Sequence, residues 1–171
     1  NVYYLELDQI SENIQAAVIS TEDQKFYQHK GVDYKAILRA VVAMIRNGEV
    51  TQGGSTITQQ LARNVFLSQD KTWERKMEEI FLAIELEKKY SKSEILEYYL
   101  NNIYFGNGYY GIQAASRGYF SRDVDYLSLS EIAFLCAIPN NPTLYDPLEH
   151  PENTLKRRNR ILDNMHEGQY I

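Results

Sequence analysis

Two glutamates with contrasting neighbours are the residues of this sequence best suited to acid–base chemistry. If the predicted first helix continues past Glu22, Val18 and Phe26 lie one turn on either side of it, which places the carboxylate on an apolar face. Burial disfavours a charged carboxylate and raises its pKa, so Glu22 is a candidate proton acceptor near neutral pH. The alternative is a helix-end glutamate that turns to solvent.

Glu79 has the opposite surroundings, because Arg75 and Lys76 precede it by four and three residues on one helical face. Cationic neighbours keep a carboxylate ionised. Two carboxylates whose pKa values are pushed apart often divide the work between an acid–base group and a permanently charged one. The alternative is an ordinary surface row of ion pairs.

A glycine-rich turn precedes a set of cationic residues. Gly53 and Gly54 let the backbone come close to a ligand, and Ser55 is predicted to cap a short helix whose free N–H groups suit an anion. The basic residues that follow suit phosphate groups; they are Arg63, Lys71, Arg75 and Lys76. The alternative is a flexible loop and a solvated helix face. A nucleotide P-loop is excluded, because no Gly-Lys-Ser/Thr follows the glycines.

Helical periodicity and capping signals predict the elements that position these residues. The predicted N-terminal caps are Ser11, Asp33, Ser55 and the capping boxes that open at Ser91 and Ser128, and Pro151 begins the last helix. A long helix is predicted over residues 71–89, with an apolar stripe of Trp73, Met77, Ile80, Phe81 and Ile84. No run of alternating apolar residues indicates a sheet, so the predicted fold class is all-α.

Composition narrows the function classes. The length of 171 residues suits one domain, and the net charge of -5 disfavours a nucleic-acid partner. No stretch approaches the ~20 apolar residues that span a bilayer. The apolar residues around Cys136 predict that this cysteine is a small buried side chain. The three histidines are not spaced as the ligands of a metal site are. Residues 106–111 match the dinucleotide pattern G-x-G-x-x-G, but they follow a helix rather than a strand, so a helix-breaking loop explains them.

Together, five segments resemble the motifs of the peptidoglycan glycosyltransferases of class A penicillin-binding proteins and their monofunctional relatives. Residues 22–31 resemble E-D-x-x-F-x-x-H-x-G, residues 53–60 resemble G-G-S-T-I-T-Q-Q, and residues 75–79 resemble R-K-x-x-E. Residues 92–106 and 157–162 resemble the fourth and fifth motifs. Arg63 stands where several members carry lysine.

The resemblance implies a lysozyme-like helical fold with a head lobe and a smaller membrane-facing lobe, as a single domain over residues 1–171 of a longer, membrane-anchored chain. It implies polymerisation of lipid II into β-1,4 glycan at the outer face of the bacterial cytoplasmic membrane, with lipid II, lipid-linked glycan, the membrane surface and a fused transpeptidase domain as partners. The helix over residues 34–46, flanked by Lys35, Arg39 and Arg46, is a candidate membrane contact; core packing is the alternative.

By the same resemblance, Glu22 is the general base on the acceptor 4-hydroxyl. Glu79 assists pyrophosphate departure directly, through its basic neighbours, or through a divalent ion (Mg or Mn) that it would ligate. The implied substrate-binding residues are Asp23, Phe26, His29, Gly54, Ser55, Thr56, Gln59, Gln60, Arg63, Lys71, Arg75 and Lys76. Two other functions stay open: a lysozyme-like glycan hydrolase or lytic transglycosylase, which also needs a carboxylic acid, and a silent wall-binding module.

Overall fold

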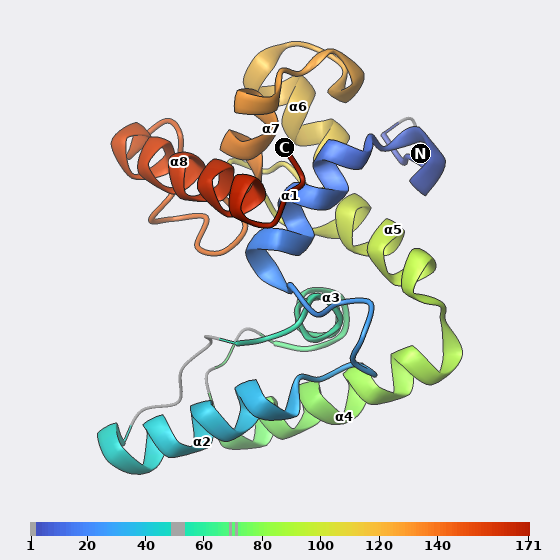
Figure 1. The fold of residues 1–171 in the computed structure, drawn as a ribbon, viewed down its shortest axis with the longest axis vertical. Coiled ribbons are helices and arrows are strands. Elements are labelled where there is room, and N and C mark those ends of the chain that lie inside the picture. Colours follow the sequence, from blue (N-terminus) through green and yellow to red (C-terminus); the bar gives the residue numbers. More distant parts are fainter. Residues whose placement is uncertain (1–2, 49–53, 69, 71) are drawn as a thin grey trace. The chain divides into compact units, whose positions relative to one another are not determined.

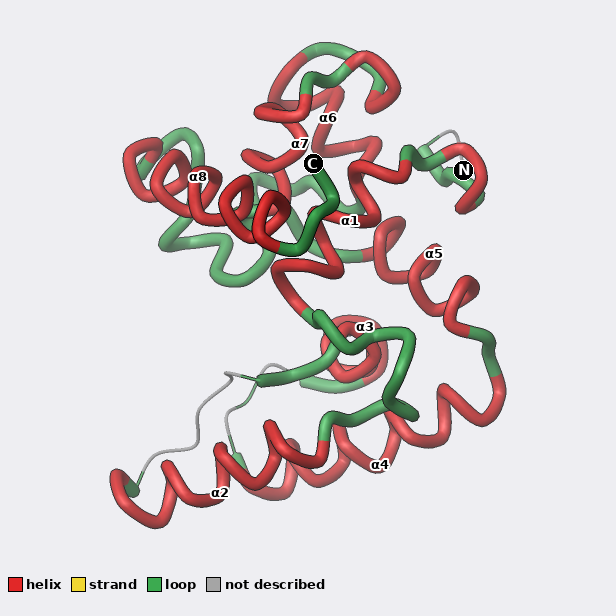
Figure 2. The backbone as a smooth tube through the Cα atoms, viewed as in Figure 1, coloured by secondary structure: helices red, strands yellow, loops and turns green. Residues whose placement is uncertain are grey.

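The computed structural model describes residues 3–48, 54–68, 70 and 72–171. Within these residues the structure consists of helices and loops with no strand, and a single isolated bridge joins Tyr104 and Tyr110 (Figure 2). The helices are η1 (Leu7–Gln9), α1 (Glu12–Glu22), α2 (Tyr34–Asn47), α3 (Ile57–Phe66), α4 (Trp73–Lys89), α5 (Lys92–Asn102), α6 (Ile112–Phe120), η2 (Val124–Tyr126), α7 (Leu129–Cys136) and α8 (Pro151–Glu167). The predicted all-α fold class is confirmed.

The chain forms two compact helical units. One unit comprises Asn1–Thr21 and Leu100–Ile171, and in it α7 packs on α8 and α6 packs on α7 and η2 (Figure 1). The other unit is Glu22–Tyr99, in which α3 packs against α4. Two helical units agree with the two lobes of the lysozyme-like fold that the resemblance implies.

Most predicted caps are present. Asp33 accepts from the backbone N–H groups of Lys35 and Ala36 at the start of α2, and Gly48 ends that helix at φ 72°. Ser91 and Ser128 form reciprocal capping boxes with Glu94 and Glu131. Local side chain-to-backbone bonds of this kind depend only on short-range sequence, which is why the pattern revealed them.

The predicted apolar stripe of α4 is wrong for three of its five residues, and the other two, Ile80 and Ile84, are half-buried. Trp73, Met77 and Phe81 are 39%, 58% and 67% exposed, whereas the buried face of α4 carries Arg75, Lys76, Glu79, Ala83 and Leu86. The two faces are both regular at helical spacing, so periodicity alone could not say which one is turned inward. The charged face is buried because its groups pair with one another, as described below.

The loop over residues 106–111 confirms the rejection of a dinucleotide site. Gly106, Gly108 and Gly111 all have positive φ, and a Cβ on Gly111 would lie 2.5 Å from the carbonyl oxygen of Asn101. The glycines therefore serve a tight turn between α5 and α6. Cys136 is buried, as expected. None of the helices in the described part of the chain has the length and apolar composition needed to cross a bilayer.

Candidate active site

A buried cluster of charged side chains surrounds Glu79, whose side chain has no exposed surface. Its Oε1 accepts from Arg75 Nη1 at 2.5 Å and from Arg63 Nη1 at 3.3 Å. Its Oε2 accepts from Lys76 Nζ at 2.6 Å and from Gln59 Nε2 at 3.0 Å. Helices α3 and α4 thus supply four donors to one carboxylate.

These donors control the ionisation of the cluster. Burial alone would raise the pKa of Glu79, but the charge of Lys76, the hydrogen bonds from Arg75 and Lys76 and the charge of Arg63 outweigh it, so the pKa lies below its ordinary value. Burial lowers the pKa of Lys76, and Glu79 counteracts that effect only in part. The prediction that cationic neighbours hold Glu79 ionised is supported. The alternative, a row of ion pairs on the surface, does not apply, because these ion pairs are buried.

The cluster has binding capacity left over. Three cations surround one carboxylate, which gives a net charge of +2 when all are protonated. Arg75 Nε donates to the carbonyl oxygen of Asp70 at 2.8 Å, but its buried Nη2 has no hydrogen-bond partner within the described residues. Lys76 Nζ also donates to Ser55 Oγ at 2.6 Å. Excess positive charge and a spare guanidinium donor suit a phosphate-bearing ligand.

Glu22 is the last residue of α1 and is half-buried. Gln60 Nε2 donates to Glu22 Oε2 at 3.2 Å, and Gln60 Oε1 accepts from the Tyr99 hydroxyl at 3.0 Å, which fixes the direction of the amide. Val18 is buried on α1 as predicted, but the helix does not continue to Phe26, because the chain turns directly after Glu22. The predicted rise in the pKa of Glu22 stays a prediction.

Two consecutive residues of α3 therefore hold the two glutamates. Gln59 donates to Glu79 and Gln60 donates to Glu22. Both glutamines are buried, at 1% and 7% exposed. The second sequence motif therefore positions both carboxylates through two adjacent side-chain amides.

Protein side chains, those of Thr56, Gln59 and Asp23, satisfy the backbone N–H groups at the N-terminus of α3. Thr56, rather than the predicted Ser55, is the N-cap: its Oγ1 accepts from Gln59 N at 3.1 Å, and Gln59 Oε1 accepts from Thr56 N at 3.1 Å. Asp23 Oδ2 accepts from Ile57 N at 3.1 Å. An anion does lie at this helix terminus, but it is the Asp23 carboxylate. Ser55 instead faces Lys76.

A second buried network holds the loop that follows Glu22. His29 Nε2 lies 2.6 Å from Asp23 Oδ2, and His29 Nδ1 lies 3.3 Å from Lys92 Nζ and 3.5 Å from Glu87 Oε2. Glu87 Oε2 also accepts from Thr58 Oγ1 and from Lys92 Nζ, each at 2.8 Å. Burial would lower the pKa of His29, but its bonds with Asp23 and Glu87 outweigh this and raise it. The loop is thereby tied to α3, α4 and α5.

Sequence reasoning did not single out Glu87, and it noted Thr58, Lys92 and Tyr99 only as parts of motifs. Glu87 lies eight residues after Glu79, close to two turns along α4, which was the available signal. Phe26 is fully buried beneath Lys92, whose Nζ lies 4.6 Å from the ring centroid.

The remaining predicted residues divide between described and undescribed parts of the chain. Gly54 has φ 86°, and a Cβ there would lie 3.2 Å from Ala36 Cβ. The space beside this glycine is therefore occupied by α2. Lys71 and Gly53 lie outside the described residues. Whether the other residues also contact substrate stays a prediction.

The groups around Glu79 do not fit a resident divalent ion. Both carboxylate oxygens accept from cations, and a dication placed there would meet three positive charges. Hard divalent ions are held by several oxygen ligands, and no group of three acidic, histidine or cysteine side chains suited to a metal occurs among the described residues. The predicted role of Glu79 as a metal ligand therefore has no support from its surroundings.

This site combines a half-buried carboxylate at the end of α1 with a second carboxylate that is fully buried among fixed cations. The transglycosylase family model matches residues 1–166. Penicillin-binding protein 1A of Aquifex aeolicus is 48% identical over 99% of this chain and 23% of its own length. Penicillin-binding protein 2a of Streptococcus pneumoniae is 50% identical over 98% of this chain and 22% of its own length.

The chain belongs to the transglycosylase family, and the enzyme class predicted from the motifs, peptidoglycan glycosyltransferase, is confirmed. It spans about a quarter of the length of the curated relatives it matches. Among solved structures, penicillin-binding protein 1A from Haemophilus influenzae matches with a TM-score of 0.46 and 30% identity over 67% of this chain and 14% of that chain.

Proposed function

We propose that this domain polymerises lipid II into β-1,4-linked glycan with inversion at the anomeric carbon and release of undecaprenyl pyrophosphate. The observation that carries the proposal is the pairing of two differently solvated carboxylates by Gln59 and Gln60. Glu22 is half-buried and accepts from the Gln60 amide, whereas Glu79 is fully buried among cations.

In the proposed reaction, Glu22 takes the proton of the acceptor 4-hydroxyl. The acceptor oxygen forms a bond to the donor anomeric carbon, the bond from that carbon to the pyrophosphate oxygen breaks, and its electron pair leaves with the pyrophosphate. Arg63, Arg75 and Lys76 stabilise the developing negative charge. The Nη2 donor of Arg75 is a candidate for direct contact with a phosphate oxygen.

The lowered pKa of Glu79 argues against a role as the acid that protonates the leaving group. A group held ionised by three cations is a poor proton donor. Among the roles implied for Glu79, the one through its basic neighbours is therefore the best supported. Glu79 orients Arg63, Arg75 and Lys76 and keeps them close together despite their mutual repulsion.

We propose that the domain acts at the outer face of the bacterial cytoplasmic membrane. On α2, Tyr34, Leu38 and Ile45 are 72%, 64% and 74% exposed, and only Ala36 of that helix is buried. Core packing, the alternative considered for this helix, does not account for these side chains. An apolar helix face flanked by basic residues suits a bilayer interface, where a lipid-linked substrate would be reached. A fused transpeptidase domain in the parent protein is part of the same proposal.

The test is incubation of the purified chain with labelled lipid II, with and without Mg²⁺ or Mn²⁺, followed by separation of the products by size. Long glycan that lysozyme digests is the expected product. Glu22→Gln should lower the rate by about 10² to 10⁴, the usual scale of a general base, while Glu12→Gln in the first turn of the same helix should not. Cleavage of soluble cell wall without polymer would identify a hydrolase, and equal rates for the two variants would remove Glu22 from the mechanism.

A further inference from the structure

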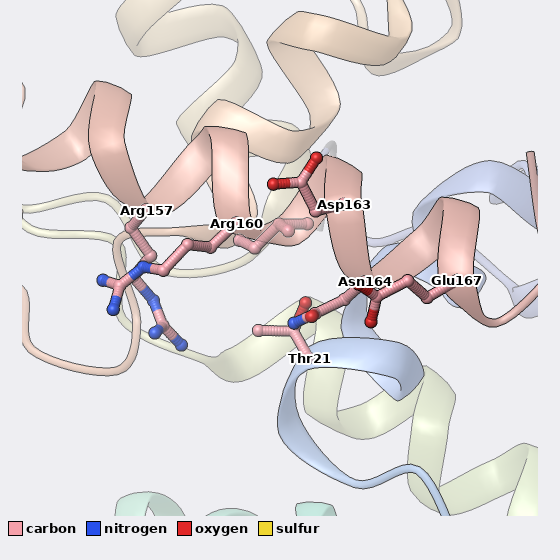
Figure 3. Close-up of a pocket in the computed structure, with 7 residues that line it drawn as sticks. Thr21, Arg157, Arg160, Asp163, Asn164 and Glu167 are labelled. Atoms are coloured by element: carbon pink, nitrogen blue, oxygen red, sulfur yellow. The ribbon is translucent and has the colours of Figure 1, made fainter.

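A cavity of about 350 Å³ lies between the end of α1 and one side of α8 (Figure 3). Of its charged residues, Arg160, Asp163 and Glu167 are exposed, so water solvates them and they select no particular ligand. A charged residue that folding has removed from water carries more information, because its partners must stabilise it. Glu87 is such a residue, and the mechanism above does not use it.

Glu87 lies on α4, and its side chain is only 7% exposed. It follows Glu79 by eight residues, which is about 12 Å along the helix axis at a rise of about 1.5 Å per residue. The Glu87 carboxylate is thus well separated from the cations that surround Glu79. A contribution of Glu87 to the reaction must therefore pass through a neighbouring element.

Glu87 binds α3 directly. Its Oε2 accepts from Thr58 Oγ1 at 2.8 Å, and Thr58 has no exposed surface. Lys92 of α5 neutralises the carboxylate, with its Nζ 2.7 Å from Glu87 Oε1. Burial alone would raise the pKa of Glu87, but three side-chain hydrogen bonds and the charge of Lys92 outweigh it, so the pKa lies below its ordinary value. An ionised acceptor makes the bond from Thr58 stronger than a bond between neutral groups.

A second route links Glu87 to the start of α3. His29 lies between two carboxylates: its Nδ1 is 3.5 Å from Glu87 Oε2, and its Nε2 is 2.6 Å from Asp23 Oδ2. The same oxygen of Asp23 accepts from the backbone N–H of Ile57, the first residue of α3, at 3.1 Å. Two consecutive residues of α3 are therefore connected to Glu87, Thr58 directly and Ile57 indirectly.

Helix α3 crosses α4 and is bonded to it at two separate points. Figure 1 shows α3 along its axis while α4 runs across the view, and the two helices pack on each other. Gln59 bonds to Glu79. Thr58, the preceding residue, points about 100° away from it around the helix and bonds to Glu87, eight residues further along α4. A helix bonded at one of these points can turn about it, whereas bonds at both points fix its rotation.

We propose that Glu87 is a positioning residue for glycosyl transfer, because its bond with Thr58 sets the rotation of α3. That rotation directs the amides of Gln59 and Gln60, which hold the two glutamates of the site. The proposal rests on the proposed function for the roles of these glutamates. Without the bond from Thr58 to Glu87, the base and the leaving-group cations would lose their relative placement. The turnover number kcat should then fall more than KM rises, since a displacement of about 1 Å in an active site can cost about a hundredfold in rate.

The first test removes the Thr58 hydroxyl and keeps the shape of the side chain. With labelled lipid II, Thr58→Val should lower kcat per folded molecule by roughly 10- to 100-fold and change KM by less than about twofold; urea unfolding gives the folded fraction. Thr58→Ser keeps the hydroxyl and should retain most of the wild-type kcat. Glu85→Gln, which removes an exposed charge of α4 that pairs with Lys88, should change neither constant. Equal kcat losses in Thr58→Val and Thr58→Ser, or an unchanged kcat in Thr58→Val, would overturn the proposal.

The second test asks whether Thr58 and Glu87 act through one bond. Glu87→Met removes the acceptor and keeps an unbranched side chain of similar length. Each single variant should lower kcat, and the double variant should lose no more than the larger single loss, since both changes remove the same bond. Losses that multiply in the double variant would show separate roles and overturn the proposal.

The third test does not depend on polymerisation. In the isotope-labelled chain, the carboxyl carbon signals of Glu22 and Glu79 should move in Thr58→Val and keep their wild-type positions in Thr58→Ser and Glu85→Gln. Failure of the wild-type chain to polymerise lipid II would refute the proposed function, whereas these movements would still support the control of α3 by Glu87. Signals that stay in place in Thr58→Val would refute the positioning proposal alone.

Discussion

The charge balance around Glu79 leads to a quantitative prediction for Glu79→Gln. The glutamine keeps the shape of the side chain, but it removes the one negative charge that Arg63, Arg75 and Lys76 share. Its amide nitrogen would also point a donor at a cation. Removal of one partner from a buried ion pair costs about 3–5 kcal/mol, because the remaining charge is left uncompensated in the interior.

Glu79 is fully buried, so solvent screening does not reduce this cost. For a domain of this size, each kcal/mol lowers Tm by about 2–4 °C, so Glu79→Gln should lower Tm by about 6–20 °C. The pKa of Glu79 lies below its ordinary value of 4.5, so its contribution is present above that pH and is lost as the pH falls through the folded-state pKa. The difference between wild type and variant should shrink in acid.

Urea unfolding at pH 7 measures the effect, with Glu85→Gln as the matched control. Glu85 lies on the same helix and pairs with Lys88 at 3.2 Å, but its side chain is 45% exposed, so its loss should cost about 1 kcal/mol or less. Adding Lys76→Met to Glu79→Gln should recover part of the loss, since it removes one of the uncompensated cations. Equal stabilities for Glu79→Gln and Glu85→Gln would refute the view that Glu79 holds the cationic cluster together.

Three further predictions concern the network, the turn and the exposed helix face. Asp23 and Glu87 raise the pKa of His29 above 6.5, against burial and the charge of Lys92, so the stabilising contribution of His29 should be present below pH 6.5 and lost as the pH rises through the folded-state pKa. The difference in unfolding free energy between wild type and His29→Gln, measured by urea unfolding, should therefore fall over this pH range. A difference that does not depend on pH would contradict this assignment. Gly31→Ala should destabilise the fold by about 1–3 kcal/mol in the same assay, because φ is 105° and a Cβ would lie 2.7 Å from a carbonyl oxygen of α4, and an unchanged midpoint would show that this contact relaxes. Replacing both Leu38 and Ile45 by Gln should weaken binding to anionic lipid vesicles by roughly a hundredfold in a flotation assay, whereas unchanged flotation would remove α2 from the membrane contact.

Local signals in the sequence were enough to predict the helices. The Asp33 cap, the capping boxes at Ser91 and Ser128 and the proline that begins α8 all act within four residues, and each is present as predicted. The cationic surroundings of Glu79 were also predictable, because Arg75 and Lys76 are its helical neighbours. These contacts need no knowledge of the tertiary fold.

The contacts that sequence spacing could not supply are those between elements. Gln59 reaches Glu79 across 20 residues of sequence, and Gln60 reaches Glu22 across 38. The buried face of α4 was assigned to the wrong side because its charged residues look solvent-facing until Arg63 and Gln59 arrive from α3. A charged helix face is inside only when another element completes its pairs, and that information is not local.

The adjacent amides of Gln59 and Gln60 explain how one short helix positions two carboxylates in different surroundings, one half-buried and one fully buried. Consecutive residues on an α-helix point about 100° apart, so adjacent glutamines cannot serve the same group. Gln59 is directed into the dry cationic cluster, and Gln60 is directed to the half-buried end of α1. Because Thr56 and Asp23 fix the first turn of α3, rotation of the helix would displace both carboxylates at once. In the proposed mechanism, the position of the Glu22 base relative to the cations that would stabilise the leaving group is therefore set by the register of α3 and by the loop that carries Asp23.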